Sequence, residues 1–192
     1  MSTYDPQGTI TFDAYGNRML EPQEPDHVVR SRVARLRELG LLGLQRDEQF
    51  CDFAAKITRA FNAAVAVVNI FDDKNQTFVG AHIQAGGDAS SLTSMPKNVG
   101  WCPHTLARRK AFPLGDVMDY PRFAGNVLVD EMNARAYLGA PLIDDTGTAL
   151  GTVCVVDIEK RDWNNSDVQT IKKFAGDVVQ GIYDRQGGIV LP

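Results

Sequence analysis

The sequence predicts an α+β domain built on an antiparallel sheet, and three observations support this fold class. Apolar residues recur at helical spacing in residues 47–61 and again in residues 168–182. Residues 64–72 form a valine-rich run that is typical of a buried strand. Two further strand-like runs, 135–142 and 149–157, flank a short turn. Because connections this short join antiparallel strands, an all-parallel sheet is excluded.

Three long helices are expected. The first has Asp26 as its N-cap and ends at Gly40. Its arginines fall largely outside the apolar stripe and indicate a solvated face; they are Arg30, Arg32, Arg35 and Arg37. The second helix spans about residues 47–61. The third follows a capping box made by Ser166 and Gln169.

The strands are joined mainly by short turns. Residues 64–72 and 76–81 form a hairpin, and residues 111–116 form a further short strand. Pro141 cannot donate a backbone hydrogen bond, so its strand lies at an edge or is bulged there. Residues 86–95 are small and polar, which makes them the best candidate for a mobile loop over a site.

Composition excludes several classes of function. The chain has 192 residues, 44% of them hydrophobic, which suffices for one core in one domain. A net charge of −4 and a pI near 5.3 provide no basic stripe for nucleic acid. No apolar run is long enough to span a bilayer, and no secretory signal opens the chain. The three widely spaced cysteines do not predict a disulfide framework. We therefore expect a cytoplasmic protein without membrane contact.

The predicted domain occupies residues 26–186, between an N-terminal extension (1–25) and a C-terminal tail (187–192). Within the extension, residues 9–12 and the polar residues after them favour a small hairpin. No output domain is expected after the tail, so the chain is a stand-alone module or a segment of a longer protein.

Five motifs follow one another in a fixed order. They are Phe78-Val79-Gly80-Ala81, Pro96-Lys97-x-x-x-Trp101-Cys102-x-His104, Asp116-x-x-Asp119-x-x-Arg122-Phe123, Tyr137-x-Gly139-x-Pro141-Leu142 and Leu150-Gly151-Thr152-Val153-Cys154. Together they resemble the GAF domain family, in particular the type found beside histidine kinases and cyclic-dinucleotide enzymes in bacterial sensors.

The resemblance implies a GAF-like, six-stranded antiparallel sheet with the terminal helices on one face and a ligand pocket on the other. It implies a non-catalytic sensory or regulatory domain for an unidentified small molecule or a signalling protein partner, with a homodimer formed through the terminal helices. A ligand is expected to shift residues 86–98 and the helix at Cys102. No cofactor is assigned. The candidate pocket residues are Trp101, Cys102, His104, Asp116, Phe123, Arg135 and Tyr137.

Cys102 has the clearest chemical role among these candidates. If its helix begins at Pro103, Cys102 is the N-cap, where free amides and the helix dipole favour a thiolate. The structural alternative is a small side chain that fills the cap.

Two alternatives from other classes stay open. One is a thiol-based redox enzyme or sensor acting through Cys102, similar to free methionine sulfoxide reductase; the other is a ligand-free dimerisation module. Residues 98–102 resemble a cysteine segment of that reductase. Residues 123–127 contain no second cysteine, so no resolving thiol is expected near Cys102.

Metal and pigment sites are not predicted. Zinc needs four ligands, and the other cysteines and histidines lie far apart in sequence. Bilin-binding members of the family attach the pigment through a cysteine followed directly by histidine, whereas Pro103 intervenes here. The cyclic-nucleotide pattern is not matched, and haem has no flanking signal. His104 is interpreted as a surface or pocket-lining residue.

Charged residues around the third motif are expected to fix a loop. Asp119 is predicted to form an ion pair with Arg122 or Arg135. Arg135 is also a candidate for contacting a ligand carboxylate.

Overall fold

The structure is a computed structural model that describes residues 10–12, 18–20 and 24–187. Its centre is a six-stranded antiparallel sheet with the strand order β5-β4-β3-β8-β7-β6. The strands are β3 (Val65–Phe71), β4 (Asn75–Ile83), β5 (Ser94–Pro96), β6 (Phe112–Leu114), β7 (Ala136–Ile143) and β8 (Ala149–Asp157). This arrangement confirms the predicted fold class.

A separate two-stranded sheet precedes the domain. It consists of β1 (Ile10–Phe12) and β2 (Arg18–Leu20), which pair antiparallel. The small hairpin expected in the N-terminal extension is therefore confirmed. β2 contacts a short helix of the domain, α4 (Pro121–Ala124).

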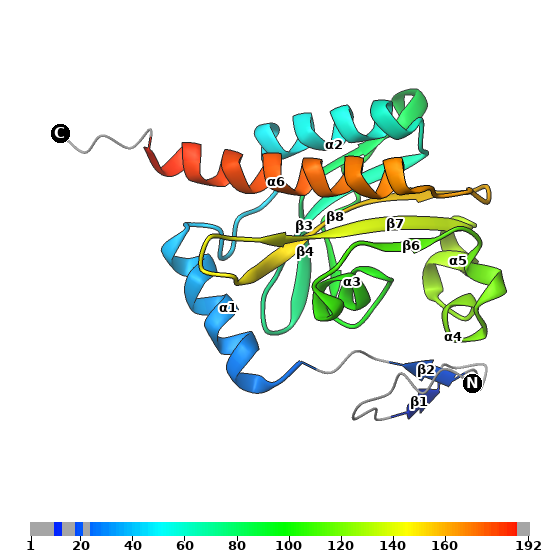
Figure 1. Cartoon of the computed structure of the whole chain (residues 1–192), viewed down its shortest axis with the longest axis horizontal. Helices are drawn as coiled ribbons and strands as arrows, with labels where there is room; N and C mark the ends of the chain where they lie inside the picture. The colour runs from blue at the N-terminus through cyan, green and yellow to red at the C-terminus, as the bar shows by residue number, and fades with distance from the viewer. Residues whose placement is uncertain (1–9, 13–17, 21–23, 188–192) are drawn as a thin grey trace.

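The helices cover both faces of the central sheet. α2 (Glu48–Phe61) and α6 (Asn165–Gly187) lie side by side on one face, and α3 (Cys102–Arg108) lies on the opposite face (Figure 1). The remaining helices are α1 (Asp26–Glu38), α5 (Val127–Met132) and the short 3₁₀ turns η1 (Gln84–Gly86) and η2 (Val117–Asp119).

Strand alternation explains why the sheet has two cores. Along β3, Ala66, Val68 and Ile70 pack in the core beneath α2 and α6. Val65 and Val67 point to the other face and pack in the core that contains α3. Because successive residues of a strand face opposite sides, a strand buried on both faces reads as a continuous apolar run.

The first helix differs from its prediction in two respects. Pro25 occupies the N-cap position and Asp26 is the first helical residue, so Asp26 is not the cap. The solvated arginine face is wrong for Arg32, which is 1% exposed, and for the half-buried Arg35. Both side chains have carboxylate partners, and these partners allow the guanidinium groups to be buried.

The caps of the other long helices follow ordinary rules. The Asp47 carboxylate accepts a hydrogen bond from the Gln49 amide at the start of α2. At the start of α6, the Asn164 side chain accepts from the amides of Ser166 and Asp167, and Asp167 accepts from the Asn164 amide. The capping box therefore lies two residues before the predicted Ser166–Gln169 pair.

Pro141 and the predicted loop occupy the edges of the sheet. β6 pairs with β7 only at Tyr137–Gly139, so Pro141 lies beyond the end of β6, at an open edge as expected. Part of the predicted 86–95 loop is ordered, since β5 pairs with β4 at Ser94–Pro96. Within the described ranges, none of the helices combines the length and the apolar character that a membrane span requires.

Candidate functional site

An apolar cavity of about 50 Å³ lies between the sheet and the segments around α3 and α5. Its wall comes from β3, β4 and β8, from the 92–102 segment and from α5 and β7. The lining residues are Val65, Val67, Gln76, Phe78, Leu92, Met95, Gly100, Trp101, Cys102, Leu128, Met132, Tyr137, Cys154 and Val156. An engineered cavity that binds benzene measures about 150 Å³. In its present shape this cavity is therefore too small for a tetrapyrrole or a dinucleotide.

The predicted pocket residues fall into two groups. Trp101, Cys102 and Tyr137 line the cavity. The other four lie outside it: His104, Asp116, Phe123 and Arg135. The structure thus brings three of the seven residues together around one space.

Cys102 faces a second thiol that the sequence reasoning did not assign to it. The Sγ atoms of Cys102 and Cys154 are 3.6 Å apart, although the two residues are separated by 52 positions in the chain. They are 8% and 2% exposed. The expectation that no resolving thiol lies near Cys102 is therefore wrong. The sequence signal was the alternation in β8, where Val153 and Val155 pack in the core beneath α2 and α6 and Cys154 packs in the opposite core.

The position of Cys102 in its helix also differs from the prediction. Cys102 is the first residue of α3, with Trp101 as N-cap and Pro103 within the first turn. Its acidity comes from side chains rather than from a cap position. The hydrogen bond with the Cys154 thiol lowers the pKa of Cys102 to about 7, with help from Thr152 and Tyr137 and against the opposing effect of burial.

The pKa of Cys154 moves in the opposite direction. Its hydrogen bond with Cys102, together with burial, raises the pKa of the Cys154 thiol. Burial, together with the neighbouring thiolate charge, raises the pKa of the Tyr137 phenol as well. Cys102 is therefore the more acidic thiol of the coupled pair, and Cys154 and Tyr137 are the donors beside it.

Gly139 makes room for the phenol that contacts Cys102. The Tyr137 hydroxyl lies 3.5 Å from Cys102 Sγ and 2.7 Å from the Thr105 hydroxyl. A Cβ atom at Gly139 would lie 2.1 Å from the Tyr137 hydroxyl oxygen. The Tyr137-x-Gly139 spacing therefore serves to let the ring fold back along its own strand.

Trp101 has an unsatisfied donor in the cavity wall. Its side chain is fully buried, and its indole Nε1 has no hydrogen-bond partner among the described residues. Buried donors are almost always paired, so each exception calls for an explanation. Because this nitrogen has no accessible surface, it is enclosed within the wall and does not open into the cavity in its present shape.

A buried polar network holds the segment before α3. Asn69 accepts hydrogen bonds from the amide and hydroxyl of Thr152 and donates to the Gln76 side chain. Gln76 in turn donates to the backbone carbonyls of Pro96 and Val99. The network therefore ties the central strands to the loop that carries Trp101 and Cys102.

His104 lies on the side of α3 that faces β6 and α4. Its ring makes an edge contact with Phe123, with centroids 5.0 Å apart, and is 6.2 Å from the Phe112 ring. Burial, with the charges of Arg122 and Arg108, lowers the pKa of His104 to about 4. The imidazole is therefore neutral at physiological pH and belongs to an aromatic cluster.

Arg135 has a different partner from the one predicted. Two of its guanidinium nitrogens donate to the two oxygens of Asp116, at 3.1 and 2.5 Å, instead of to Asp119. This hydrogen bonding holds the pKa of Asp116 below its usual value. Arg122 lies over the Phe123 ring at 4.7 Å. Within the described part of the chain, no cluster of three or more metal-ligating side chains occurs.

Comparisons with known proteins agree with this geometry. The model of the GAF domain family matches residues 45–182. A cyclic di-GMP phosphodiesterase of Pseudomonas aeruginosa is 32% identical over 167 residues, which cover 86% of this chain and 27% of that protein. The chain therefore spans about a quarter of the length of this relative.

Solved structures show the same fold at low identity. A far-red cyanobacteriochrome photoreceptor has a TM-score of 0.59 at 13% identity, covering 82% of this chain and 97% of that one. The GAF domain of an Acinetobacter phosphoenolpyruvate-protein phosphotransferase has 0.58 at 12%, covering 84% and 94%. Free methionine-R-sulfoxide reductase from Neisseria meningitidis has 0.57 at 17%, covering 86% and 96%.

Proposed function

This chain belongs to the GAF domain family, and from that membership we propose that it is a sensory or regulatory module, without catalysis of its own, that takes a small ligand in the cavity beside Cys102. The family match at residues 45–182 contains every residue of the cavity wall. The observation that carries the proposal is this apolar cavity, whose wall includes Trp101, a buried side chain with an unpaired indole N–H.

The cavity defines the chemistry of the ligand. Its volume of about 50 Å³ accommodates only a few heavy atoms. Its wall includes the polar side chains of Gln76, Trp101 and Tyr137, but none of their nitrogen or oxygen atoms has accessible surface in the cavity. The ligand is therefore a compact, largely apolar molecule, and we propose that it carries one hydrogen-bond acceptor that pairs with Trp101 Nε1 once the wall has shifted.

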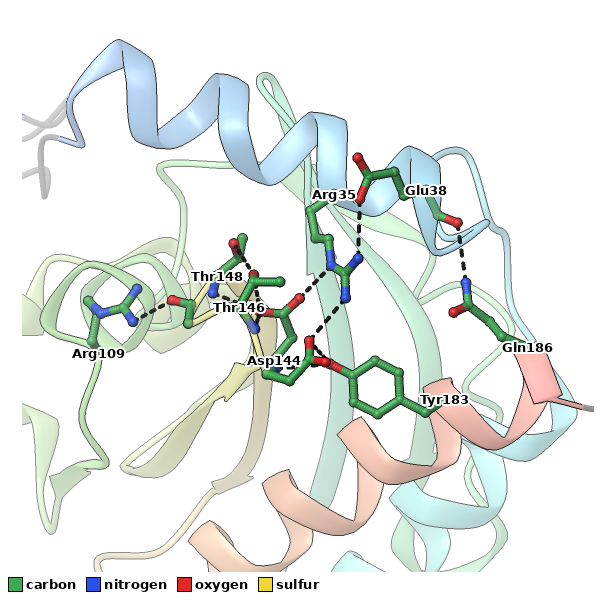
Figure 2. Close-up of polar contacts among 10 residues, drawn as sticks. Arg35, Glu38, Arg109, Asp144, Thr146, Thr148, Tyr183 and Gln186 are labelled. Atoms are coloured by element: carbon green, nitrogen blue, oxygen red, sulfur yellow. Dashed lines mark hydrogen bonds and ion pairs between the residues drawn. The ribbon is translucent and has the colours of Figure 1, made fainter.

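The turn between β7 and β8 provides a route from the cavity to the outer helices. Arg109, the C-cap of α3, donates to the Gly147 carbonyl of this turn at 2.6 Å (Figure 2). The same turn contacts α1 through Arg35 and Asp144, and α6 through Tyr183 and Asp145.

A displacement of α3 by a ligand is therefore transmitted to both α1 and α6. The turn is small and rigid, because Asp144 accepts hydrogen bonds from the backbone amides of Thr146 and Thr148. A connector that contacts both the binding-site helix and the two outer helices gives coupling a physical path, and we propose that this turn shifts between two positions as the cavity fills.

The output of the module is proposed from its relative and its outer surface. One relative is a cyclic di-GMP phosphodiesterase, so we propose that this module regulates an enzyme of bacterial signalling. We also propose a cytoplasmic homodimer formed through α6. The outward residues of α6 are polar, among them Gln169, Lys172 and Gln180, so that contact would be polar. Light scattering at increasing concentration tests the dimer.

Ligand binding is tested with a library of small acceptor-bearing molecules and with xenon as an inert probe of the cavity. A ligand at 100 times its Kd raises stability by about 2.7 kcal/mol, which corresponds to roughly 5–10 °C in Tm. Trp101→Phe removes the donor and is expected to weaken the affinity for an acceptor-bearing ligand about five-fold or more, while xenon still binds.

Trp163→Phe is the matched control. The Trp163 Nε1 atom donates to the Leu114 carbonyl, and Trp163 is not part of the cavity wall. This substitution should leave ligand affinity unchanged. If Trp101→Phe and Trp163→Phe bind every ligand equally well, the proposed recognition by Trp101 is wrong.

A further inference from the structure

The two buried thiols of the cavity wall lie so close together that a small movement would allow them to form a disulfide. Cys102 comes from the start of α3 and Cys154 from β8, and their Sγ atoms lie 3.6 Å apart. The third cysteine, Cys51, lies on α2 against the opposite face of the sheet. We propose that Cys102 and Cys154 form an oxidative modification site, at which a hydroperoxide converts the two thiols into an intramolecular disulfide.

The required movement is small. A disulfide has an S–S distance of about 2.05 Å, so the two sulfur atoms must approach by roughly 1.5 Å. β8 is a central strand with a partner on each side, so it is held in place. Cys102 begins a helix of seven residues that follows a loop, so the approach is made by α3.

The cavity selects the oxidant by size. Both cysteines line the space of about 50 Å³, and a single water needs roughly 10–15 Å³. Hydrogen peroxide, which is close to water in size, therefore fits beside the sulfur atoms. A glutathione disulfide is far too large for this space, so exchange with it is disfavoured.

The reaction is balanced in two steps. The Cys102 thiolate attacks one oxygen of the hydroperoxide, the O–O bond breaks, and an alcohol or water leaves after protonation. Cys102 is then a sulfenic acid. The Cys154 sulfur attacks Cys102 Sγ, the S–O bond breaks, and the thiol proton of Cys154 leaves with the hydroxide as water. Two thiols and one hydroperoxide yield one disulfide, one alcohol and one water.

The surroundings assign different roles to the two sulfur atoms. Cys102 accepts the Tyr137 hydroxyl hydrogen bond, and its lowered pKa favours the nucleophilic thiolate. Cys154 has a raised pKa and stays a thiol, which suits the resolving role. This site needs only the two thiols, so it stands whether or not the cavity binds a ligand.

The product would connect α3 covalently to the central sheet. Trp101 directly precedes Cys102. Arg109, the C-cap of the same helix, donates a hydrogen bond to the β7–β8 turn. Oxidation is therefore expected to shift α3 and to alter the fluorescence of Trp101, which a Trp163→Phe background isolates.

The test treats the folded protein with hydrogen peroxide, blocks the remaining thiols by alkylation and identifies tryptic peptides by mass spectrometry. The expected product is 2 Da lighter than the reduced chain and links peptide 98–108 to peptide 136–160. Cys51, in peptide 47–56, is the internal control and should be lost at least ten-fold more slowly than Cys102. Oxidised glutathione should act at least ten-fold more slowly than peroxide.

Variants separate the two steps. In Cys154→Ala, dimedone should label Cys102, because the sulfenic acid has no resolving thiol. In Cys102→Ala, Cys154 should stay reduced. The wild-type result does not depend on whether either variant folds. The proposal is overturned if the wild-type thiols of Cys102 and Cys154 stay reduced while Cys51 is oxidised, or if Cys102 reaches the sulfinic acid without forming the link.

Discussion

Arg35 of α1 and Asp144 of the β7–β8 turn form a largely buried ion pair across 109 residues of sequence. The Arg35 Nε donates to Asp144 Oδ2 at 2.6 Å, and the Asp144 side chain has no exposed surface. Burial by itself would raise the pKa of Asp144, but hydrogen bonds from Thr146, Arg35 and Thr148 outweigh it and hold the pKa below its usual value. The pair therefore fixes α1 to the turn that also contacts α3 and α6.

Removing the cation of this pair is expected to destabilise the domain. Arg35→Met keeps much of the side-chain length but leaves the Asp144 carboxylate buried without its charged partner. Breaking a buried pair in this way costs several kcal/mol; because Arg35 is 21% exposed, we expect about 2–3 kcal/mol. Urea denaturation at pH 7 measures this loss. Lys173→Met, which removes the exposed pair with Asp177, is the control and should change stability by less than about 1 kcal/mol.

The same ion pair is expected to make the stability of the domain fall at acidic pH. Because the pKa of Asp144 is lowered in the folded state, its contribution is complete above the ordinary aspartate pKa of about 4 and is lost as the pH falls through the folded value. The Arg35→Met variant should therefore lose less additional stability than the wild type below pH 4. Equal losses would argue against the assigned role of Asp144.

His104 is expected to make the stability of the domain depend on pH in a higher pH range than Asp144 does. Its folded-state pKa is about 4, because burial and the charges of Arg122 and Arg108 oppose the imidazolium. The unfolded chain takes up this proton near pH 6.5, so the wild type loses stability as the pH falls from about 6.5 to 4, by roughly 2–3 kcal/mol.

His104→Leu should remove that part of the pH dependence while retaining apolar packing against Phe112 and Phe123. Denaturation curves at pH 7, 5.5 and 4.5 compare the two proteins. In addition, the imidazole resonance of His104 should titrate near pH 4 by NMR. A midpoint at the ordinary histidine value would contradict the assigned burial.

The fold could be predicted from the sequence because its signals are local. The helix of residues 48–61 and the strand of residues 65–71 were visible from the spacing of their apolar residues, and short turns required antiparallel pairing. Helix caps were less certain, because Asn, Asp and Ser all accept hydrogen bonds from free amides. At the start of α6 the capping side chain is Asn164 rather than Ser166.

The site was harder to predict because its contacts are distant in sequence. Cys102 and Cys154 meet only through the placement of α3 against β8. The charged face of α1 reads as solvated, since the partners of Arg32 and Arg35 cannot be identified from helical spacing. Strand alternation could have placed Cys154 on the cavity side, but this was not predicted, and its distance from Cys102 required the three-dimensional structure.

Gly80 allows β4 to pack closely against α2, so a larger side chain at this position is expected to disturb the packing. A Cβ atom at this position of β4 would lie 2.2 Å from the Phe50 carbonyl oxygen on α2. Gly80→Ala therefore forces α2 away from the sheet, at a cost of about 2–3 kcal/mol in unfolding free energy. Gly176→Ala, on the exposed face of α6 with nothing within 4 Å, should instead stabilise by about 0.5–1 kcal/mol. Thermal denaturation distinguishes these opposite signs.

Replacing Gln76 is expected to loosen the part of the cavity wall that precedes α3. Its side chain is 1% exposed, accepts from Asn69 and donates to the Pro96 and Val99 carbonyls at 3.1 and 2.7 Å. Gln76→Leu preserves the approximate volume but leaves these groups unpaired, which should cost about 2–3 kcal/mol. Because the lost bonds anchor the loop before α3, amide hydrogen exchange should accelerate in residues 97–102 more than in β7.

A control substitution must show that the effect of Gln76→Leu is specific to Gln76 and does not follow from replacing a glutamine elsewhere. Gln84→Leu removes one exposed hydrogen bond to Asn62 and should change stability by less than about 0.5 kcal/mol, with no change in exchange at residues 97–102. Similar exchange rates in both variants would mean that the loop is held by apolar contacts. Faster exchange in Gln76→Leu alone would identify the Asn69–Gln76 hydrogen bond and its two carbonyl partners as the anchor of the segment that carries Trp101 and Cys102.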